Sequence, residues 1–318
     1  MRTILKISVM LAFVALTLSI ADNPIPRDNP GRIVTFDVAV TDKNDNPIAG
    51  LRREDFRVFE DNVQQTITRF DTNRKPLAIV LLVEFTEAFD AARYDAVEPA
   101  VRLINALEPH DWGALVSFDV VPEIVTDFTH DKTVLSRDFR GLQMPYYRQA
   151  ALFDAVYFVL DRLRGVEEKK AIVLLGTGSD TMSSKRTLGD ALRKAETSNT
   201  TIYTVSFAQA PRSLTFPEFD PGAPFRADDA ERNLAEFAEA SGGLSFTPFH
   251  PGQYRRVYEV VNADLRNQYT LSFVSTSSKD GTKLRKLRIE VANTEIHHEG
   301  KLEKLKVRHK RGYYGSGS

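Results

Sequence analysis

Oxygen-bearing side chains follow two apolar runs at the points where buried strands should end. The run 76–83 leads into Glu84 and Thr86, and the run 171–175 leads to Thr177, with Asp180 three residues further on. Carboxylate and hydroxyl oxygens are the ligands that Mg²⁺ prefers, in near-ideal octahedral geometry. Only one carboxylate comes directly at a strand end, so we expect no functional metal ion. Glu84, Thr86 and Asp180 are the candidates if a rearranged cation site exists.

The sequence offers little for catalysis. Gly176-Thr177-Gly178 follows a strand pattern, but Thr181 stands where a dinucleotide fingerprint needs its third glycine, and no Gly-Lys-Ser/Thr phosphate loop occurs. The surroundings of Ser179 do not form a nucleophile elbow, and the chain has no cysteine for thiol chemistry. The six histidines show no metal-ligand spacing. We therefore expect no enzymatic activity and no cofactor, with a divalent cation such as Mg²⁺ as the alternative.

Between residues 76 and 267, buried strands alternate with amphipathic helices, which is the pattern of a parallel sheet covered on both faces. After Glu84, apolar residues recur at three- and four-residue spacing as far as Ile104 and predict the first helix. A short strand at 123–125 is close enough to pair antiparallel at an edge. The other predicted strands are 114–118, 171–175, 201–207 and 244–246, and the other predicted helices are 152–163, 188–196, 234–237 and 254–265.

Both ends of the chain predict β-strands instead. The N-terminal part has strand patterns at 34–40, 56–59 and 65–70, and the C-terminal part has them at 269–274, 287–291 and 305–307. Neither end has enough strands to cover a hydrophobic face alone. We therefore predict one β-sandwich domain assembled from residues 32–73 and 268–314. A doubly wound α/β domain, residues 75–267, is inserted between them, which requires its two ends to lie close together.

The strand ends resemble those of a von Willebrand factor A domain. In that family the first strand ends in Asp-x-Ser-x-Ser, a Thr precedes Leu-Tyr-Asp-Ala, and a later strand ends in Thr-Asp-Gly. Together their oxygens hold a divalent cation. The matching positions here are Glu84, Thr86, Ala88, Ala150 and Thr177. The resemblance therefore implies a preserved scaffold with a degenerate metal-ion-dependent adhesion site.

Three segments extend the resemblance to nearly the whole mature chain: residues 41–61, the strand that starts at Pro76, and the ending 308–314. Together they are similar to the VWFA-related acidobacterial domain family. Membership in that family would imply an exported protein with an A-type domain and no enzymatic activity. It would say more about fold than about function.

The first 21 residues have the pattern of a secretory signal peptide. Arg2 and Lys6 precede the apolar stretch 7–18, and Ser19-Ile20-Ala21 is a small-x-small cleavage pattern. About a dozen apolar residues are too few to span a bilayer core of roughly 30 Å. We therefore expect a mature chain that begins near Asp22 with a linker, 22–31, and has no transmembrane anchor. We expect an exported destination, periplasmic or extracellular, and the lack of cysteine excludes a disulfide framework and lipid attachment through an N-terminal cysteine.

The 42 basic and 43 acidic residues nearly cancel, so we expect no nucleic-acid partner. A local basic run between residues 301 and 311 alternates with apolar residues, and we interpret it as the solvent-exposed face of an edge strand. The irregular stretch 209–227, rich in proline and phenylalanine, predicts a long loop.

Loops that follow strand carboxyl ends converge in doubly wound sheets. We therefore expect 84–89, 144–149 and 177–183 to form a common top face that contacts a protein partner in the cell envelope. Its aromatic rings either are exposed for that contact or pack inward and join the loops in place of an ion. The candidate binding residues are Glu84, Phe85, Thr86, Phe89, Tyr146, Tyr147, Thr177 and Asp180.

These observations favour an exported, non-enzymatic protein-binding or scaffold protein. One alternative is a metal-dependent adhesion module with a rearranged cation site. Another is a structural subunit of an envelope complex that makes contact through an exposed edge of the sandwich.

Overall fold

The computed structural model describes residues 32–72, 75–142, 147–207, 227–278, 281–291, 297–298, 301–302 and 305–315. The predicted signal peptide and linker, Tyr146 and nearly all of the loop 209–227 lie outside the described residues. Phe89 lies in the first turn of a helix, but its side chain is also outside the description.

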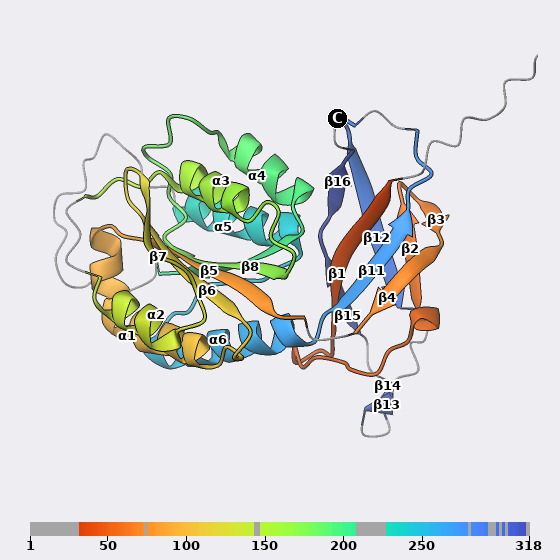
Figure 1. Cartoon of the computed structure of the whole chain (residues 1–318), viewed down its shortest axis with the longest axis horizontal. Helices are drawn as coiled ribbons and strands as arrows, with labels where there is room; N and C mark the ends of the chain where they lie inside the picture. The colour runs from red at the N-terminus through yellow and green to blue at the C-terminus, as the bar shows by residue number, and fades with distance from the viewer. Residues whose placement is uncertain are drawn as a thin grey trace, which may run out of the picture. The chain divides into compact units, whose positions relative to one another are not determined.

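A six-stranded sheet forms the centre of the α/β domain (Figure 1). Its strands are β5 (Leu77–Glu84), β6 (Trp112–Phe118), β7 (Pro122–Thr129), β8 (Lys169–Gly176), β9 (Thr200–Ser206) and β10 (Ser245–Phe246). They lie in the order β7-β6-β5-β8-β9-β10, and only β7 runs antiparallel, at the edge. This is the doubly wound order in which the direction of winding switches between β5 and β8. All eight residues of β5 are buried, as expected for a strand covered on both faces.

Helices cover both faces of this sheet (Figure 1). One face carries α1 (Glu87–Asn105), α2 (Lys132–Arg140) and α6 (Pro251–Arg266), and the other carries α3 (Leu152–Arg162), α4 (Leu188–Thr197) and α5 (Ala227–Ser241). Alternate strand residues feed the two cores, so that Leu81 packs with the first group and Leu82 with the second. The sequence did not predict α2, whose N-cap Asp131 accepts hydrogen bonds from Thr133 N and Val134 N.

The two chain ends form two antiparallel four-stranded sheets that pack around a separate core. One sheet has the order β15-β1-β11-β4 and the other β16-β12-β2-β3. The strands are β1 (Ile33–Thr41), β2 (Phe56–Glu60), β3 (Val63–Gln65), β4 (Ile67–Asp71), β11 (Tyr269–Val274), β12 (Leu284–Val291), β15 (Lys306–His309) and β16 (Gly312–Tyr314). A 3-10 turn, Arg53–Asp55, precedes β2, and β13 (His297–His298) pairs with β14 (Lys301–Leu302) in a separate two-stranded sheet.

The prediction of a single strand at 65–70 is wrong. Gln65 pairs with Val58 in one sheet, whereas Ile67 pairs with Phe273 in the other. The chain therefore crosses between the two sheets at Thr66, and one apolar-polar pattern supplies two short strands. Because β1 pairs with β11, and β2 with β12, each sheet joins strands from both ends of the chain.

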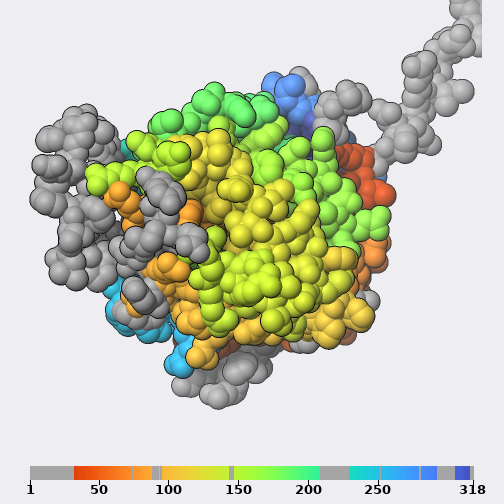
Figure 2. Space-filling model, turned by 60° about the vertical axis from the view of Figure 1, so that its left-hand side comes forward, coloured from red at the N-terminus to blue at the C-terminus, as the bar shows by residue number. Residues whose placement is uncertain are grey.

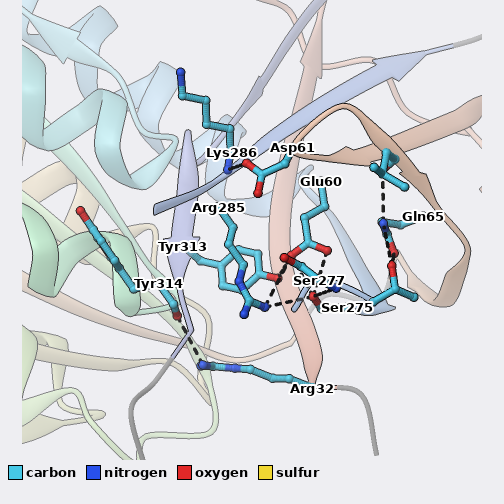
Figure 3. Close-up of polar contacts among 12 residues, drawn as sticks. Arg32, Glu60, Asp61, Gln65, Ser275, Ser277, Arg285, Lys286, Tyr313 and Tyr314 are labelled. Atoms are coloured by element: carbon cyan, nitrogen blue, oxygen red, sulfur yellow. Dashed lines mark hydrogen bonds and ion pairs between the residues drawn. The ribbon is translucent and has the colours of Figure 1, made fainter. Parts of the chain in front are cut away.

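A buried polar cluster sits inside the sandwich (Figure 3). Glu60, at the end of β2, accepts hydrogen bonds from Ser275 Oγ at 2.8 and 2.9 Å and from the Tyr313 hydroxyl. Arg285 Nη1 lies 3.7 Å from Glu60 Oε1 and donates to Ser275 Oγ at 3.1 Å. A buried carboxylate needs such partners, because an unpaired buried charge is very costly. The cluster joins β2, β12, β16 and the segment after β11.

The interpretation of the basic run 301–311 as solvent-exposed is wrong for part of it. β15 is an edge strand, and Lys306 is exposed, but Lys310 is buried and donates to Asn199 Oδ1 at 3.1 Å. Arg308 pairs with Asp264 of α6, and Arg311 pairs with Glu196 of α4. These partners lie 44 and 115 residues away in the sequence, so alternation along one strand did not predict them. The run holds the C-terminal strands against the α/β domain.

The fold class is the predicted one: a doubly wound, mostly parallel α/β sheet inserted in a β-sandwich built from both chain ends. The domain boundaries themselves stay predictions. Within the described residues, no helix is both long and apolar enough to cross a membrane.

Candidate functional site at the strand ends

Glu84 lies at the carboxyl end of β5, beside the point where the sheet changes its winding direction. Its side chain is 2% exposed. The Thr177 backbone N–H donates to Glu84 Oε2 at 2.6 Å, and the Thr177 hydroxyl lies 2.8 Å from Oε2 and 3.1 Å from Oε1. The Thr86 hydroxyl donates to Oε1 at 2.9 Å. The carboxyl group thus joins the ends of the adjacent strands β5 and β8.

Two neighbours show how closely this carboxyl group is enclosed. Thr86 occupies the N-cap position of α1, but its hydroxyl serves Glu84 and makes no cap hydrogen bond. Gly176 leaves room for the longer side chain, since a Cβ there would lie 2.9 Å from Glu84 Oε2. Burial raises the pKa of the Glu84 carboxyl, and the hydrogen bonds from Thr177 and Thr86 oppose that shift only in part.

Asp180 serves a different purpose from Glu84. Its Oδ1 accepts from Phe153 N at 3.1 Å and from Ser183 Oγ at 2.5 Å. Phe153 is in the first turn of α3, whose N-cap Ala151 offers no side-chain acceptor. Asp180 therefore satisfies a free helix N–H from outside the helix, and its negative charge suits that end of the helix dipole. Burial raises the pKa of Asp180, with these hydrogen bonds acting against it.

The predicted top face is brought together by backbone hydrogen bonds. Glu87 N donates to Tyr147 O at 3.2 Å, and Arg148 forms an ion pair with Glu87 at 2.9 Å. Thr181 N and Met182 N both donate to Ala150 O, at 2.8 and 3.0 Å. The three loops that follow β5, precede α3 and follow β8 are therefore neighbours, as the doubly wound order predicts.

The rings of the top face divide between the two predicted orientations. Phe85 is partly buried and packs against the core beneath α1, whereas Tyr147 is 48% exposed. Three further apolar side chains are exposed on loops that follow strands of the sheet: Val121 at 60%, Met182 at 46% and Phe249 at 67%. Sequence reasoning missed these three residues. Their only signal was an apolar residue within a predicted loop.

In Figure 2 the face turned to the viewer is formed mostly by the yellow and yellow-green surface of the segment that contains β7, α2 and α3. The remaining exposed large apolar side chains of the described chain, Ile33, Val63 and Val274, belong to the sandwich. Among the described residues of the α/β domain, the exposed large apolar side chains thus lie on loops beyond the carboxyl ends of the parallel strands or, for Tyr147, on the loop before α3.

The residues present do not fit a divalent cation of the type that the resemblance implies. Both oxygens of Glu84 accept hydrogen bonds, and the hydroxyls of Thr86 and Thr177 point their hydrogens at it. Asp180 is directed at the start of α3 instead. Across the described ranges, no three His, Cys, Asp or Glu side chains are grouped to hold a metal ion. Mg²⁺ would have to displace this network while giving up water reluctantly.

No protein-family model and no curated protein matches the sequence. Among solved structures, the chain is similar to a von Willebrand factor type A protein from Catenulispora acidiphila, with a TM-score of 0.48, 11% identity and coverage of 90% of this chain and 74% of that one. It is also similar to an aerotolerance-related membrane protein from Bacteroides fragilis, with a TM-score of 0.47, 11% identity and coverage of 59% and 98%.

A third similar structure is the von Willebrand factor domain of a type V pilus tip protein from Porphyromonas gingivalis, with a TM-score of 0.45, 13% identity and coverage of 60% and 95%. Two of these three structures are thus described as von Willebrand factor domains.

Proposed function

We propose that this is an exported, non-enzymatic binding protein whose top face contacts a protein partner in the cell envelope without a bridging metal ion. The observation that carries the proposal is the exposure of Val121, Tyr147, Met182 and Phe249 on loops at the carboxyl-terminal end of the parallel sheet. Exposed apolar and aromatic side chains on a rigid scaffold are typical of protein-binding surfaces.

The proposed contact uses no bridging metal ion because the carboxyl group of Glu84 is bound within its own chain. In a metal-bridged contact, the ion keeps an open position for a ligand from the partner. Here the carboxyl group is satisfied by Thr86 and Thr177 of the same chain. Binding energy therefore has to come from apolar burial and from hydrogen bonds at the rim of the contact.

The test is capture from an envelope fraction of the producing cell on the immobilised protein. The top-face variant carries Tyr147→Ser and Met182→Ser, and the matched control carries Ile33→Ser and Val63→Ser, which remove two exposed apolar groups from the sandwich. Loss of two central contacts should reduce capture of a specific partner by about ten-fold or more. All three proteins should have the same melting temperature, because the substituted side chains are exposed.

Equal capture by the top-face variant and the control would refute the proposal. Capture that disappears on chelation and returns with Mg²⁺ would instead favour the adhesion-module alternative. Capture lost only in the sandwich control would favour the structural-subunit alternative.

A further inference from the structure

A second candidate site lies at the opposite end of the α/β domain from the top face. A cavity of about 340 Å³ is bounded by β1 and β11 of the sandwich, the start of β8, and the end of α6. Its volume is in the range of small-molecule sites, roughly 300–1,000 Å³. Its walls are polar: Thr35, Asp37 and Thr270 come from the sandwich, and Lys169, Lys170 and Asn199 come from the α/β domain.

Some charges of this cavity are already neutralised. Arg266 forms a buried ion pair with Asp111, and Arg69 lies 3.5 Å from Asp71. Glu167 and Glu168, in the loop before β8, also line the cavity, but Glu167 is exposed to solvent and Glu168 partly so. Asp37 accepts a hydrogen bond from Thr270 Oγ1 at 2.6 Å.

Lys169 and Lys170 differ from the two ion-paired arginines. The Lys169 ammonium donates to Leu265 O at 3.0 Å, and the Lys170 ammonium donates to Val166 O at 3.0 Å. Both acceptors are neutral carbonyls of residues that themselves line the cavity. Within the described part of the chain, no carboxylate lies within ion-pair distance of either lysine. Each ammonium also keeps donor capacity, because an ammonium has three N–H groups and one acceptor is accounted for.

Burial lowers the pKa of both lysines, and the more distant Asp37 opposes that shift without cancelling it. Burial also lowers the pKa of Lys310, to about 8, and this lysine donates to the lining residue Asn199. Several cationic groups have therefore been partly removed from water in or next to this cavity. A group that restores a counter-charge there gains from both Coulomb attraction and charge-assisted hydrogen bonds.

We propose that this cavity binds a small oxyanion, the phosphate or carboxylate group of a small solute, held by Lys169 and Lys170. Both ammonium groups lie at the cavity wall and supply the charge. The hydroxyl of Thr35 and the amide N–H groups of Asn199 supply polar contacts for the rest of the solute. The site is formed jointly by the two domains, so its occupation also stabilises their contact.

The test is calorimetric titration of the full chain with inorganic phosphate and, separately, with malonate, at fixed ionic strength set with sodium chloride. Constant ionic strength matters because salt screens exposed charges and because phosphate stabilises proteins non-specifically at high concentration. We expect one site per chain. Preference for phosphate over malonate, or the reverse, identifies which kind of group the cavity accepts.

Lys169→Met and Lys170→Met should each weaken binding by at least ten-fold, and Lys283→Met, which removes an exposed lysine from the sandwich, should leave it unchanged. If the Lys169→Met protein unfolds because it loses the contact with Leu265, the Lys170→Met protein still tests whether a lysine of the cavity binds the anion, since Lys170 is partly exposed. Absence of binding heat with both anions would overturn the proposal. Unchanged affinity in Lys170→Met would overturn it as well, because the lysines would then serve only the carbonyls they contact.

Discussion

Replacement of Glu84 by alanine tests whether its hydrogen bonds with Thr86 and Thr177 hold the ends of β5 and β8 together. The substitution removes the acceptor of three buried donors: the backbone N–H of Thr177, its hydroxyl, and the hydroxyl of Thr86. Thr86 is 1% exposed and Thr177 is 6% exposed, so water does not readily replace the lost partner. The strands β5 and β8 also lose the side chain that joins their ends.

The expected cost follows from these donors. A buried donor left without a partner costs about 1–3 kcal/mol, so three of them predict a loss of about 3–9 kcal/mol in the free energy of unfolding. Glu84→Gln keeps the volume and a carbonyl acceptor for Thr177, and its amide donors can meet the two hydroxyl oxygens. We expect that variant to lose no more than about 1 kcal/mol.

Urea unfolding followed by tryptophan fluorescence is the assay. Trp112 is the only tryptophan of the chain and begins β6, next to β5, so its emission reports on the α/β domain. Its ring lies against that of His130 at 3.6 Å between centroids, and loss of that contact on unfolding changes its surroundings. A loss below about 1 kcal/mol in Glu84→Ala would refute the reasoning, because the donors would then have other partners.

The pH dependence gives an independent check on the same residue. Burial raises the pKa of Glu84 above its ordinary 4.5, so the folded protein holds the proton more tightly than the unfolded chain. The resulting stabilisation is complete below pH 4.5 and is lost as the pH rises through the folded-state pKa. The stability of wild type relative to Glu84→Gln should therefore fall over that window. If the stability difference between wild type and Glu84→Gln does not change with pH, the hydrogen bonds to Glu84 fully offset the effect of burial on its pKa.

Four further predictions concern the cation, the sandwich, its buried cluster and export. Titration with Mg²⁺ should show no site tighter than millimolar, and a micromolar site lost in Glu84→Ala would contradict this. Truncation after Asn267 should make the N-terminal strands protease-sensitive, because β1 and β2 lose β11 and β12; resistance equal to the full chain would argue against a shared sandwich. Glu60→Ala should cost about 3–5 kcal/mol because it removes one partner of a buried ion pair with Arg285, and Tyr313→Phe only about 1.5–3 kcal/mol; equal costs would show that the ion pair adds nothing. N-terminal sequencing of protein from the producing cell should begin near Asp22, and an intact Met1 would contradict the predicted export.

The α/β strands were predictable because their residues are buried on both faces. The run 171–175 lies entirely within β8, and 76–83 covers nearly all of β5. The helix α2 was harder to predict, because its nine residues include few apolar positions. Asp131 directly before it is nevertheless an N-cap signal. The division of 65–70 into β3 and β4 was not predictable, because period-two alternation does not say which sheet a strand joins.

The candidate site was predictable in part. Strand-end convergence correctly placed Glu84 near Thr177, although 93 residues separate them. What each oxygen does there depends on geometry that spacing does not contain. Asp180 resembles a spare ligand in the sequence, yet it serves the first turn of α3. Lys169 and Lys170 have the pattern of an ordinary charged strand start, and only the packing of β1 and α6 around them makes them partly buried.

The network at Glu84 has a consequence for how a partner would be recognised. A metal-bridged site gains affinity only when a partner's carboxylate completes the coordination of the ion, so its binding responds to the ion. A carboxyl group that is satisfied within its own chain has no such open position, and its hydrogen bonds hold β5 and β8 in one arrangement. Under the proposed function, the top face is therefore already in its binding arrangement before the partner arrives. Its affinity would follow the apolar area buried on Tyr147 and Met182, and its salt dependence would be small, because those side chains carry no charge.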